Sequence, residues 1–194
     1  LFRVSFERRT RVEPKEAAKL FESVEGGDTL GRWSVVASNP LWVVNVKGDS
    51  IIRTWRDSSE DQFSGNPFEI LRECLAPYKS ELISGIPSLG QLYGMWGYEL
   101  IQWIEPKVPV CVRSESDPPD GVWMFMDRVL IFDQVKRLIT AVVYADLTSN
   151  QSPLEVFEDA SFRIQDLEKL MQTSLPEVKP LPWKKASNYF DENI

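Results

Sequence analysis

The 194-residue sequence contains no histidine, and this absence excludes several kinds of catalytic centre. A Ser-His-Asp triad, a Cys-His pair and a histidine general base all need an imidazole ring. The only two cysteines, Cys74 and Cys111, lie far apart and form no Cys-x-x-Cys pair, so a structural zinc site lacks its ligands. We expect both to be free thiols in a reducing compartment. Acid–base chemistry would have to use carboxylates or lysines.

Long apolar runs and an excess of basic residues are missing too. No stretch reaches the ~18 continuous apolar residues that a membrane-spanning helix requires, and no signal peptide is visible. The 22 Lys and Arg residues against 29 Asp and Glu residues give a formal net charge of −7. Such a balance disfavours binding to the phosphate backbone of nucleic acids. We expect a cytoplasmic protein with no nucleic-acid partner and no membrane partner.

The sequence does hold enough apolar residues for a large core. It is 43% hydrophobic, contains seven tryptophans, and has the length of one large domain or two small ones. Runs rich in Val, Ile and Trp predict strands, the first three as a meander with tight turns, at 33–37, 41–46, 50–55, 89–96, 122–126, 129–133 and 138–145. Three further segments predict loops or a short turn or helix, at 57–65, 97–105 and 106–121.

Three segments carry helix signals. Pro14 suits the first position of a short helix over 14–21, which would end near Glu22. Asn66, followed by proline, predicts a helix that ends near residue 76. Ser152 begins the clearest signal, a capping sequence with an apolar stripe behind it at Phe157, Ala160, Ile164, Leu167 and Met171. Few helices among hairpin-connected strands predict an α+β fold with antiparallel sheets and packed helices.

Two residue patterns resemble chemical motifs but have simpler explanations. Gly90, Gly94 and Gly97 have the spacing of a phosphate loop, yet no Lys-Ser/Thr pair follows them. We expect them to permit close strand packing or a bulge. Asp127 and Asp133 flank a predicted strand like paired catalytic carboxylates, and we expect them to form turns at its ends.

Three blocks, in order, match the pattern of one family. The first joins Glu22 and Ser23 to Gly31, Arg32, Trp33 and Ser34. The second is the run Gly-Gln-Leu-Tyr-Gly-Met-Trp-Gly-Tyr-Glu at 90–99. The third joins Asp127 to Phe132, Asp133 and Gln134. Together they resemble the N-terminal portion of the chorismate-utilising large subunits, anthranilate synthase component I and aminodeoxychorismate synthase, and the first block is closer to the former.

The sequence departs from the family pattern inside each block. Trp33 stands where the family usually has Tyr, and Gln134 where it usually has His. In and after the second block the departures are Gln91, Met95, Glu99 and Gln102.

The resemblance implies a division of labour. Residues 1–180 would be the regulatory N-terminal domain of a lyase that converts chorismate and ammonia or glutamine to anthranilate and pyruvate. Residues 181–194 would be a linker and the start of a chorismate-binding C-terminal domain that this chain lacks. The catalytic residues and Mg²⁺ would belong to that domain, so this chain would need no cofactor and would be inactive alone. A glutamine amidotransferase subunit or domain would supply ammonia, and tryptophan would be the effector.

Five residues are implied as one wall of the tryptophan site. Ser23 and Glu22 would accept hydrogen bonds from the ammonium group. Trp33 and Leu30 would pack against the indole, and Arg32 would stack on a ring or pair with a carboxylate. Structural alternatives stand beside these roles. Ser23 would simply end the first helix, Arg32 would form a surface ion pair, and Trp33 would be a core aromatic.

Two alternative functions remain open. The same domain occurs in aminodeoxychorismate synthase, an enzyme of folate supply, and a non-catalytic module that binds a glutamine amidotransferase would use the same fold. In either case we expect exposed apolar surface where the missing half would pack, and hence self-association of the isolated chain.

Overall fold

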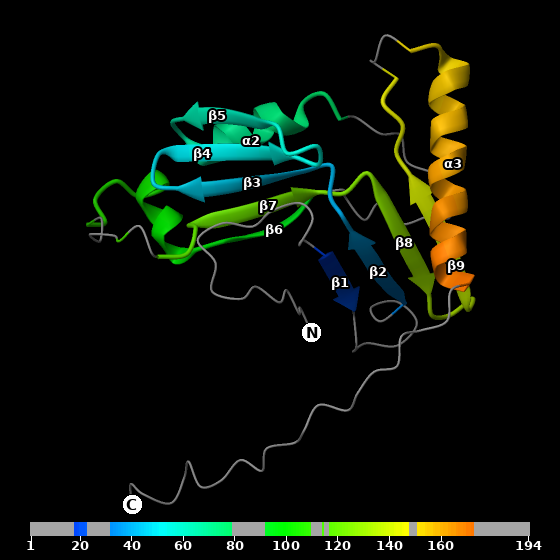
Figure 1. The fold of residues 1–194 in the computed structure, drawn as a ribbon. Coiled ribbons are helices and arrows are strands. Elements are labelled where there is room, and N and C mark those ends of the chain that lie inside the picture. The colour runs from blue at the N-terminus through cyan, green and yellow to red at the C-terminus, as the bar shows by residue number, and fades with distance from the viewer. Residues whose placement is uncertain are drawn as a thin grey trace, which may run out of the picture.

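The computed structural model describes residues 18–22, 32–78, 92–109, 114, 117–147 and 151–172, with the backbone alone described at 18–22. These residues form two antiparallel sheets (Figure 1). Sheet A has the strand order β1-β2-β8-β9, built from Ala18–Glu22, Trp33–Ser38, Arg128–Asp133 and Leu138–Val143. Sheet B has the order β5-β4-β3-β7-β6, built from Glu60–Ser64, Ser50–Trp55, Trp42–Lys47, Gly121–Phe125 and Leu92–Trp96. The predicted α+β class with antiparallel sheets is confirmed.

Sheet B is buried on both of its faces, which explains the nearly continuous apolar sequence of β3. One face packs on sheet A through a core of Val35, Ala37, Val43, Val122, Met124, Met126, Val129, Ile131 and Val142. The other face packs on α2 (Pro67–Leu75) and on the 3₁₀-helix η2 (Tyr98–Trp103). Trp42, Val44 and Val46 point into this second core, while Val43 between them points into the first. A strand covered on both faces loses the usual apolar–polar alternation.

Both of the capped helices form as predicted. The Asn66 side chain accepts a hydrogen bond from the Phe68 N–H at 3.0 Å and so begins α2. Helix α3 (Pro153–Gln172) begins with a reciprocal capping box. There the Ser152 N–H donates to Glu155 Oε2 at 2.7 Å, and the Glu155 N–H donates to Ser152 Oγ at 3.3 Å. No described helix is long and apolar enough to cross a bilayer.

Two predictions of local structure are wrong. Residues 18–21, predicted as helical, belong to β1, which pairs along its whole length with β2. An isolated helix of two turns is marginal, so sheet pairing prevails; residues 14–17 lie outside the described residues. The predicted loop over 57–65 contains β5, whose Asp61 accepts hydrogen bonds from Arg53 and Trp55 of β4. Cross-strand pairing thus stabilises an edge strand that has little apolar character.

The predicted meander of the first three runs is also only half right. β3 and β4 form a tight hairpin, in which Gly48 has a φ of 62°. β2, however, pairs with β8 in sheet A and not with β3. The chain changes sheets at Asn39, which has a φ of 53°, and Pro40. Asparagine tolerates this left-handed conformation better than most residues.

Gly94 confirms the expectation that glycines in this region permit close strand packing. A Cβ atom at this position would overlap the Val122 carbonyl oxygen and lie 2.7 Å from the Trp123 Cα. The obstruction is backbone and the Trp123 ring, which have no room to move between two paired strands. A side chain is therefore excluded at Gly94 although this glycine is itself exposed.

We therefore predict that Gly94→Ala destabilises the protein by about 2–3 kcal/mol, as overpacking does in cores. The measurement is chemical denaturation followed by tryptophan fluorescence. Met95→Ala, at the neighbouring and 47% exposed position, is the control and should change stability by less than about 0.5 kcal/mol. Equal effects of the two substitutions would contradict the prediction.

Candidate functional site

Three of the residues implied as an effector wall lie at one end of sheet A. The register places Glu22 of β1 opposite Ser34 of β2, and Trp33 opposite Asp133 of β8. Arg32 immediately precedes β2. Ser23 and Leu30 lie outside the described residues, and only the backbone of Glu22 is described. Three of the five implied residues, Glu22, Arg32 and Trp33, therefore share one end of one sheet.

The side chain of Arg32 contacts two other side chains of the protein, those of Asp133 and Trp33. Its Nε and Nη2 donate to the two oxygens of Asp133 at 3.1 and 2.7 Å, and its guanidinium lies 4.5 Å from the centroid of the Trp33 ring. A bidentate pair of this kind fixes both side chains in orientation. Trp33 is half-buried and packs against the core between the sheets. An effector carboxylate would therefore compete with Asp133 for the Arg32 guanidinium.

Asp133 forms a turn, as the sequence predicts, and it also forms the ion pair with Arg32. Its Oδ1 accepts from the backbone N–H groups of Val135 and Lys136 at 3.1 and 3.0 Å. The hydrogen bonds from Arg32, helped by those backbone groups and by the charge of Arg32, lower the pKa of Asp133 to about 2. The carboxylate is thus ionised throughout the physiological range and holds the end of β8 to the start of β2.

Gln134, which replaces the family's usual histidine, joins the same network. Its backbone N–H donates to the Arg32 carbonyl at 2.8 Å, and its side-chain Nε2 donates to Ser34 Oγ at 3.1 Å. A glutamine amide makes these contacts without a titratable ring. The end of sheet A can therefore bind polar and aromatic groups, but its described side chains present no activated nucleophile or general base.

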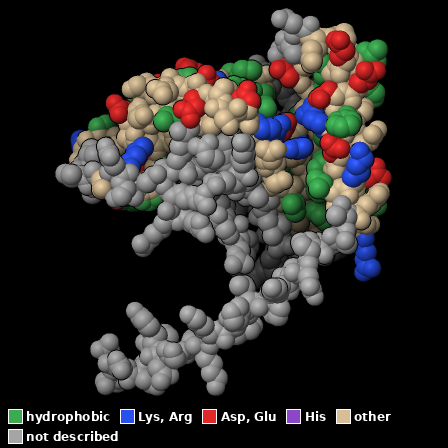
Figure 2. Space-filling view, in the orientation of Figure 1, with side chains coloured by type: hydrophobic (Ala, Val, Ile, Leu, Met, Phe, Trp, Pro, Cys, Tyr) green, Lys and Arg blue, Asp and Glu red, His purple; other side chains and the backbone are tan. Residues whose placement is uncertain are grey.

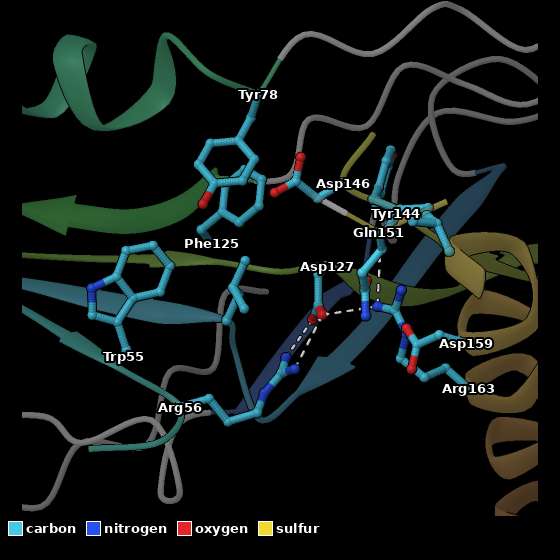
Figure 3. A pocket seen from close by; sticks show the side chains of 13 residues that line it. Trp55, Arg56, Tyr78, Phe125, Asp127, Tyr144, Asp146, Gln151, Asp159 and Arg163 are labelled. Carbon is cyan, nitrogen blue, oxygen red and sulfur yellow. Dashed lines mark hydrogen bonds and ion pairs between the residues drawn. The ribbon is translucent and has the colours of Figure 1, made fainter. Parts of the chain in front are cut away.

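A second feature, which sequence reasoning missed, is a charged cluster at the opposite end of β8. The side chain of Asp127 is 7% exposed and accepts hydrogen bonds from two arginines (Figure 3). Arg56, which follows β4, donates through both terminal nitrogens, one of them to Asp127 Oδ2 at 3.1 Å. Arg163 of α3 donates to the same Oδ2 at 3.1 Å. Asp127 lies in the bend between β7 and β8, as its position suggested, and its carboxylate in addition joins the end of β4 in sheet B to α3.

The Asp127 cluster borders a cavity of about 490 Å³ between the sheets and α3 (Figure 3). Four aromatic rings contribute to its lining, with those of Trp55, Tyr78 and Phe125 on one side and that of Tyr144 on the other (Figure 3). Sequence alone gives little sign of this arrangement, because Arg56 and Arg163 lie 71 and 36 residues from Asp127. The one available signal was an aspartate directly after an apolar run.

The described part of the chain contains no candidate metal-binding site. There, no group of three or more His, Cys, Asp and Glu side chains is placed to hold a metal ion. Cys74 is a free, buried thiol as expected, and burial raises its pKa, so it is a poor nucleophile. Cys111 lies outside the described residues.

Comparison with known proteins shows which proteins the chain is similar to. No protein-family model matches the chain. Anthranilate synthase component 1 of Synechocystis sp. is 43% identical over 159 residues, which are 81% of this chain and 31% of that protein. Anthranilate synthase component 1 of Acetivibrio thermocellus is 31% identical over 182 residues, 92% of this chain and 34% of that protein. Over most of its length, the chain thus corresponds to an N-terminal region of anthranilate synthase component 1.

The fold agrees with this assignment. The crystal structure of anthranilate synthase component I from Streptococcus pneumoniae superimposes with a TM-score of 0.55 at 21% identity, over 80% of this chain and 32% of that one. This likeness concerns the fold alone. The chain spans about a third of the length of the component 1 relatives that it matches.

We predict that Asp127→Asn destabilises the protein by about 2–3 kcal/mol, somewhat below the usual cost of breaking a buried ion pair because both arginines are partly exposed. Asparagine has nearly the same shape but leaves two guanidinium groups without their shared anion. Urea denaturation is the measurement. The control is Asp159→Asn, since this 61% exposed carboxylate pairs with Arg163 at the surface and should contribute less than about 0.5 kcal/mol. An Asp127→Asn protein as stable as the wild type would refute the structural role of the cluster.

The Arg32–Asp133 pair makes stability depend on pH in a defined window. The folded pKa of Asp133 is about 2, below its ordinary value of 3.8, so the unfolded chain takes up a proton first as pH falls. The contribution of Asp133 is complete above about pH 4 and is lost between about pH 4 and pH 2. We predict a shallower loss of unfolding free energy in this window for Arg32→Gln than for the wild type. Arg72→Gln, which removes an exposed charge on α2, should keep the wild-type slope; equal slopes in all three proteins would contradict the prediction.

Proposed function

We propose that this chain is the N-terminal regulatory region of an anthranilate-synthase-like enzyme. The parent protein would convert chorismate and ammonia or glutamine to anthranilate and pyruvate in tryptophan biosynthesis. The chain itself would contribute one wall of a tryptophan feedback site and no catalytic residue. The match to component 1 proteins over most of the chain carries this proposal.

One geometric observation supports the position of the feedback site. The backbone of Glu22 pairs with Ser34, directly beside the stacked and ion-paired group of Arg32 and Trp33. Glu22, implied for the ammonium group, and Trp33, implied for the indole ring, thus come from neighbouring strands, and Ser23 follows Glu22 in sequence. An amino-acid effector needs such a combination of polar acceptors and an aromatic wall.

The remaining components are proposed for the part of a component 1 protein that this chain does not span. These are the chorismate-binding domain, its Mg²⁺ ion and the catalytic residues, together with an amidotransferase subunit or domain that would deliver ammonia. We favour anthranilate synthase over aminodeoxychorismate synthase because the relatives reported above carry the former name. The same relatives make a stand-alone amidotransferase-binding module the weaker proposal.

Regulation would follow from linkage between effector binding and domain arrangement. Tryptophan would bind one arrangement of the two domains better than the other and would shift the population by that difference in affinity. A pocket with one wall on each domain meets this requirement, because its contacts change when the domains move.

A fusion protein tests the proposal. This chain replaces the matched region of the Synechocystis component 1, and anthranilate fluorescence is followed with chorismate, Mg²⁺ and ammonium, which removes the need for an amidotransferase. We predict anthranilate formation that tryptophan inhibits, and none from the isolated chain. Ser23→Ala should raise the tryptophan concentration for half-inhibition about tenfold, the effect of one hydrogen bond of ~1–1.5 kcal/mol.

Ser38→Ala is the matched control, because this exposed serine ends β2, at the opposite end of the strand from Trp33. It should leave inhibition unchanged. A folded fusion that forms no anthranilate would refute the proposed reaction. An active fusion whose inhibition is unaffected by Ser23→Ala would refute the proposed site and leave the reaction standing.

A further inference from the structure

The exposed apolar side chains of the described residues are concentrated in one part of the molecule. Ten of thirteen exposed large hydrophobic residues lie between Val135 and Met171, in the β8–β9 turn, β9, the segment after β9, and α3. Exposed apolar residues scattered singly need no explanation, whereas a contiguous group marks an interaction surface. In Figure 2 hydrophobic side chains appear along α3 among Asp and Glu residues.

Three of these residues form a seam on α3, which we define as Phe157, Ile164 and Met171. They are 68%, 40% and 43% exposed and are spaced by seven residues. Seven residues complete almost two helical turns, so the three side chains lie in line along the helix. The apolar stripe that the sequence predicts is therefore present but only partly covered, since Ala160 and Leu167 are half-buried while the seam is open.

The contacts that hold α3 to the rest of the molecule use a different side of the helix. Val156 is 6% exposed, and Arg163, seven residues later, reaches Asp127. Val156 and Arg163 each precede a seam residue by one position, and adjacent residues are rotated by about 100° around a helix. One side of α3, with Val156 and Arg163, thus contacts the rest of the molecule, while the side with the seam is exposed.

The beginning of β9 extends the seam. Leu138 and Ile139 are 57% and 51% exposed on opposite faces of β9, because successive strand residues point to opposite faces, and the C-terminal end of α3 lies beside this end of β9 (Figure 1). β9 is also an edge strand of sheet A. Apolar side chains are therefore exposed on both faces of the sheet rim beside the end of α3.

The charges of α3 favour one kind of partner over another. The helix carries five carboxylates, Glu155, Glu158, Asp159, Asp166 and Glu168, against two basic residues. Both basic residues are paired within the molecule, Arg163 with Asp127 and Lys169 with Asp166 at 3.6 Å. A second copy of this chain would bring like charges together, and the whole chain has a net charge of −7. A partner surface with Lys and Arg around an apolar centre has the complementary charge.

We infer that the seam and the start of β9 dock against the part of a component 1 protein that this chain does not span, through an apolar surface flanked by basic residues. The inference rests on the proposed function. Component 1 relatives are about three times as long as the matched region, so two thirds of such a protein is available to cover this face. The seam itself lies on α3 and contains none of the implied effector residues, whereas the start of β9 adjoins the Arg32–Asp133 end of sheet A, because Leu138 pairs with Asp133.

Hydrogen exchange in the fusion described above tests this inference. Amide exchange of the α3 peptides is compared between the isolated chain and the fusion with the Synechocystis protein. Docking should slow exchange across α3 at least about tenfold in the fusion, because opening the helix would then also require undocking.

A matched pair of double variants separates the seam from the rest of the helix. Phe157→Gln/Ile164→Gln changes the seam, and Phe162→Gln/Leu170→Gln changes two residues that are 57% and 68% exposed on other sides of α3. All four positions are exposed, so both variants should keep the stability of the isolated chain. The seam variant should lose the slowing of exchange in the fusion, and the control variant should retain it.

Three outcomes would overturn the inference. One is an active fusion whose α3 exchanges as fast as in the isolated chain, which would leave the proposed function intact. Another is equal loss of protection in both variants. The third is a concentration-dependent dimer of the fusion that the seam variant abolishes in sedimentation, because the face would then bind a second copy although the missing part is present. Seam-dependent protection in a fusion without activity would support docking and refute the proposed reaction.

Discussion

The fold depends most on the buried carboxylate of Asp127, because it lies where the chain passes between the two sheets. The chain crosses from sheet A to sheet B at residues 39–41 and returns at residues 126–127. Arg56 binds both crossings, since it donates to Asp127 and, at 2.8 Å, to the Asn39 carbonyl. Arg163 adds α3 to the same point, and its Nη1 also donates to the Tyr144 carbonyl at the end of β9. Two sheets and a helix are thus fixed by one anion.

A second arginine–aspartate pair fixes the other end of the same strand. β8 begins directly after Asp127 and ends at Asp133, and both aspartates are 5% exposed. Buried carboxylates are tolerated only when they are paired and hydrogen-bonded. Here Asp127 holds sheet B and α3, while Asp133 holds the start of β2 through Arg32. The two acids that resembled a catalytic pair in the sequence are in fact 6 positions apart at opposite ends of one strand, so they share no reacting atom.

The sequence predicted those elements whose signals are local. Asn66 and Ser152 each place a hydrogen-bond acceptor at a helix start, and the β7, β8 and β9 runs have too much branched and aromatic character to be anything but strands. Prediction from the sequence failed where contacts between residues far apart in the chain determine the structure. β5 exists because Asp61 meets Arg53 across the ladder, and β1 because β2 offers its edge. In the same way, no local pattern assigns β2 to sheet A, or joins Asp127 to arginines far along the chain.

The candidate site shows the same division between residue identity and residue contact. Arg32 and Trp33 were found from a family pattern, but that pattern does not reveal that Asp133 already occupies the Arg32 guanidinium. This matters for the proposed regulation. A ligand alters a conformational equilibrium only through contacts that differ between the two states. An effector that engaged Arg32 would have to weaken the bond to Asp133, and so would act on the end of β8.

The other end of β8 carries α3 through Asp127, and α3 presents the seam on its free side. The proposed effector contact and the proposed docking surface are therefore linked by a single strand that lies second from the edge of a four-stranded sheet. Such a strand, paired on both sides, moves as a unit with its neighbours and does not bend locally. Under the proposed function, a shift of β8 at the Arg32 end would be expressed as a shift of α3 against its partner. Effector binding and domain packing would then both depend on the position of β8, which is held by an arginine at each end.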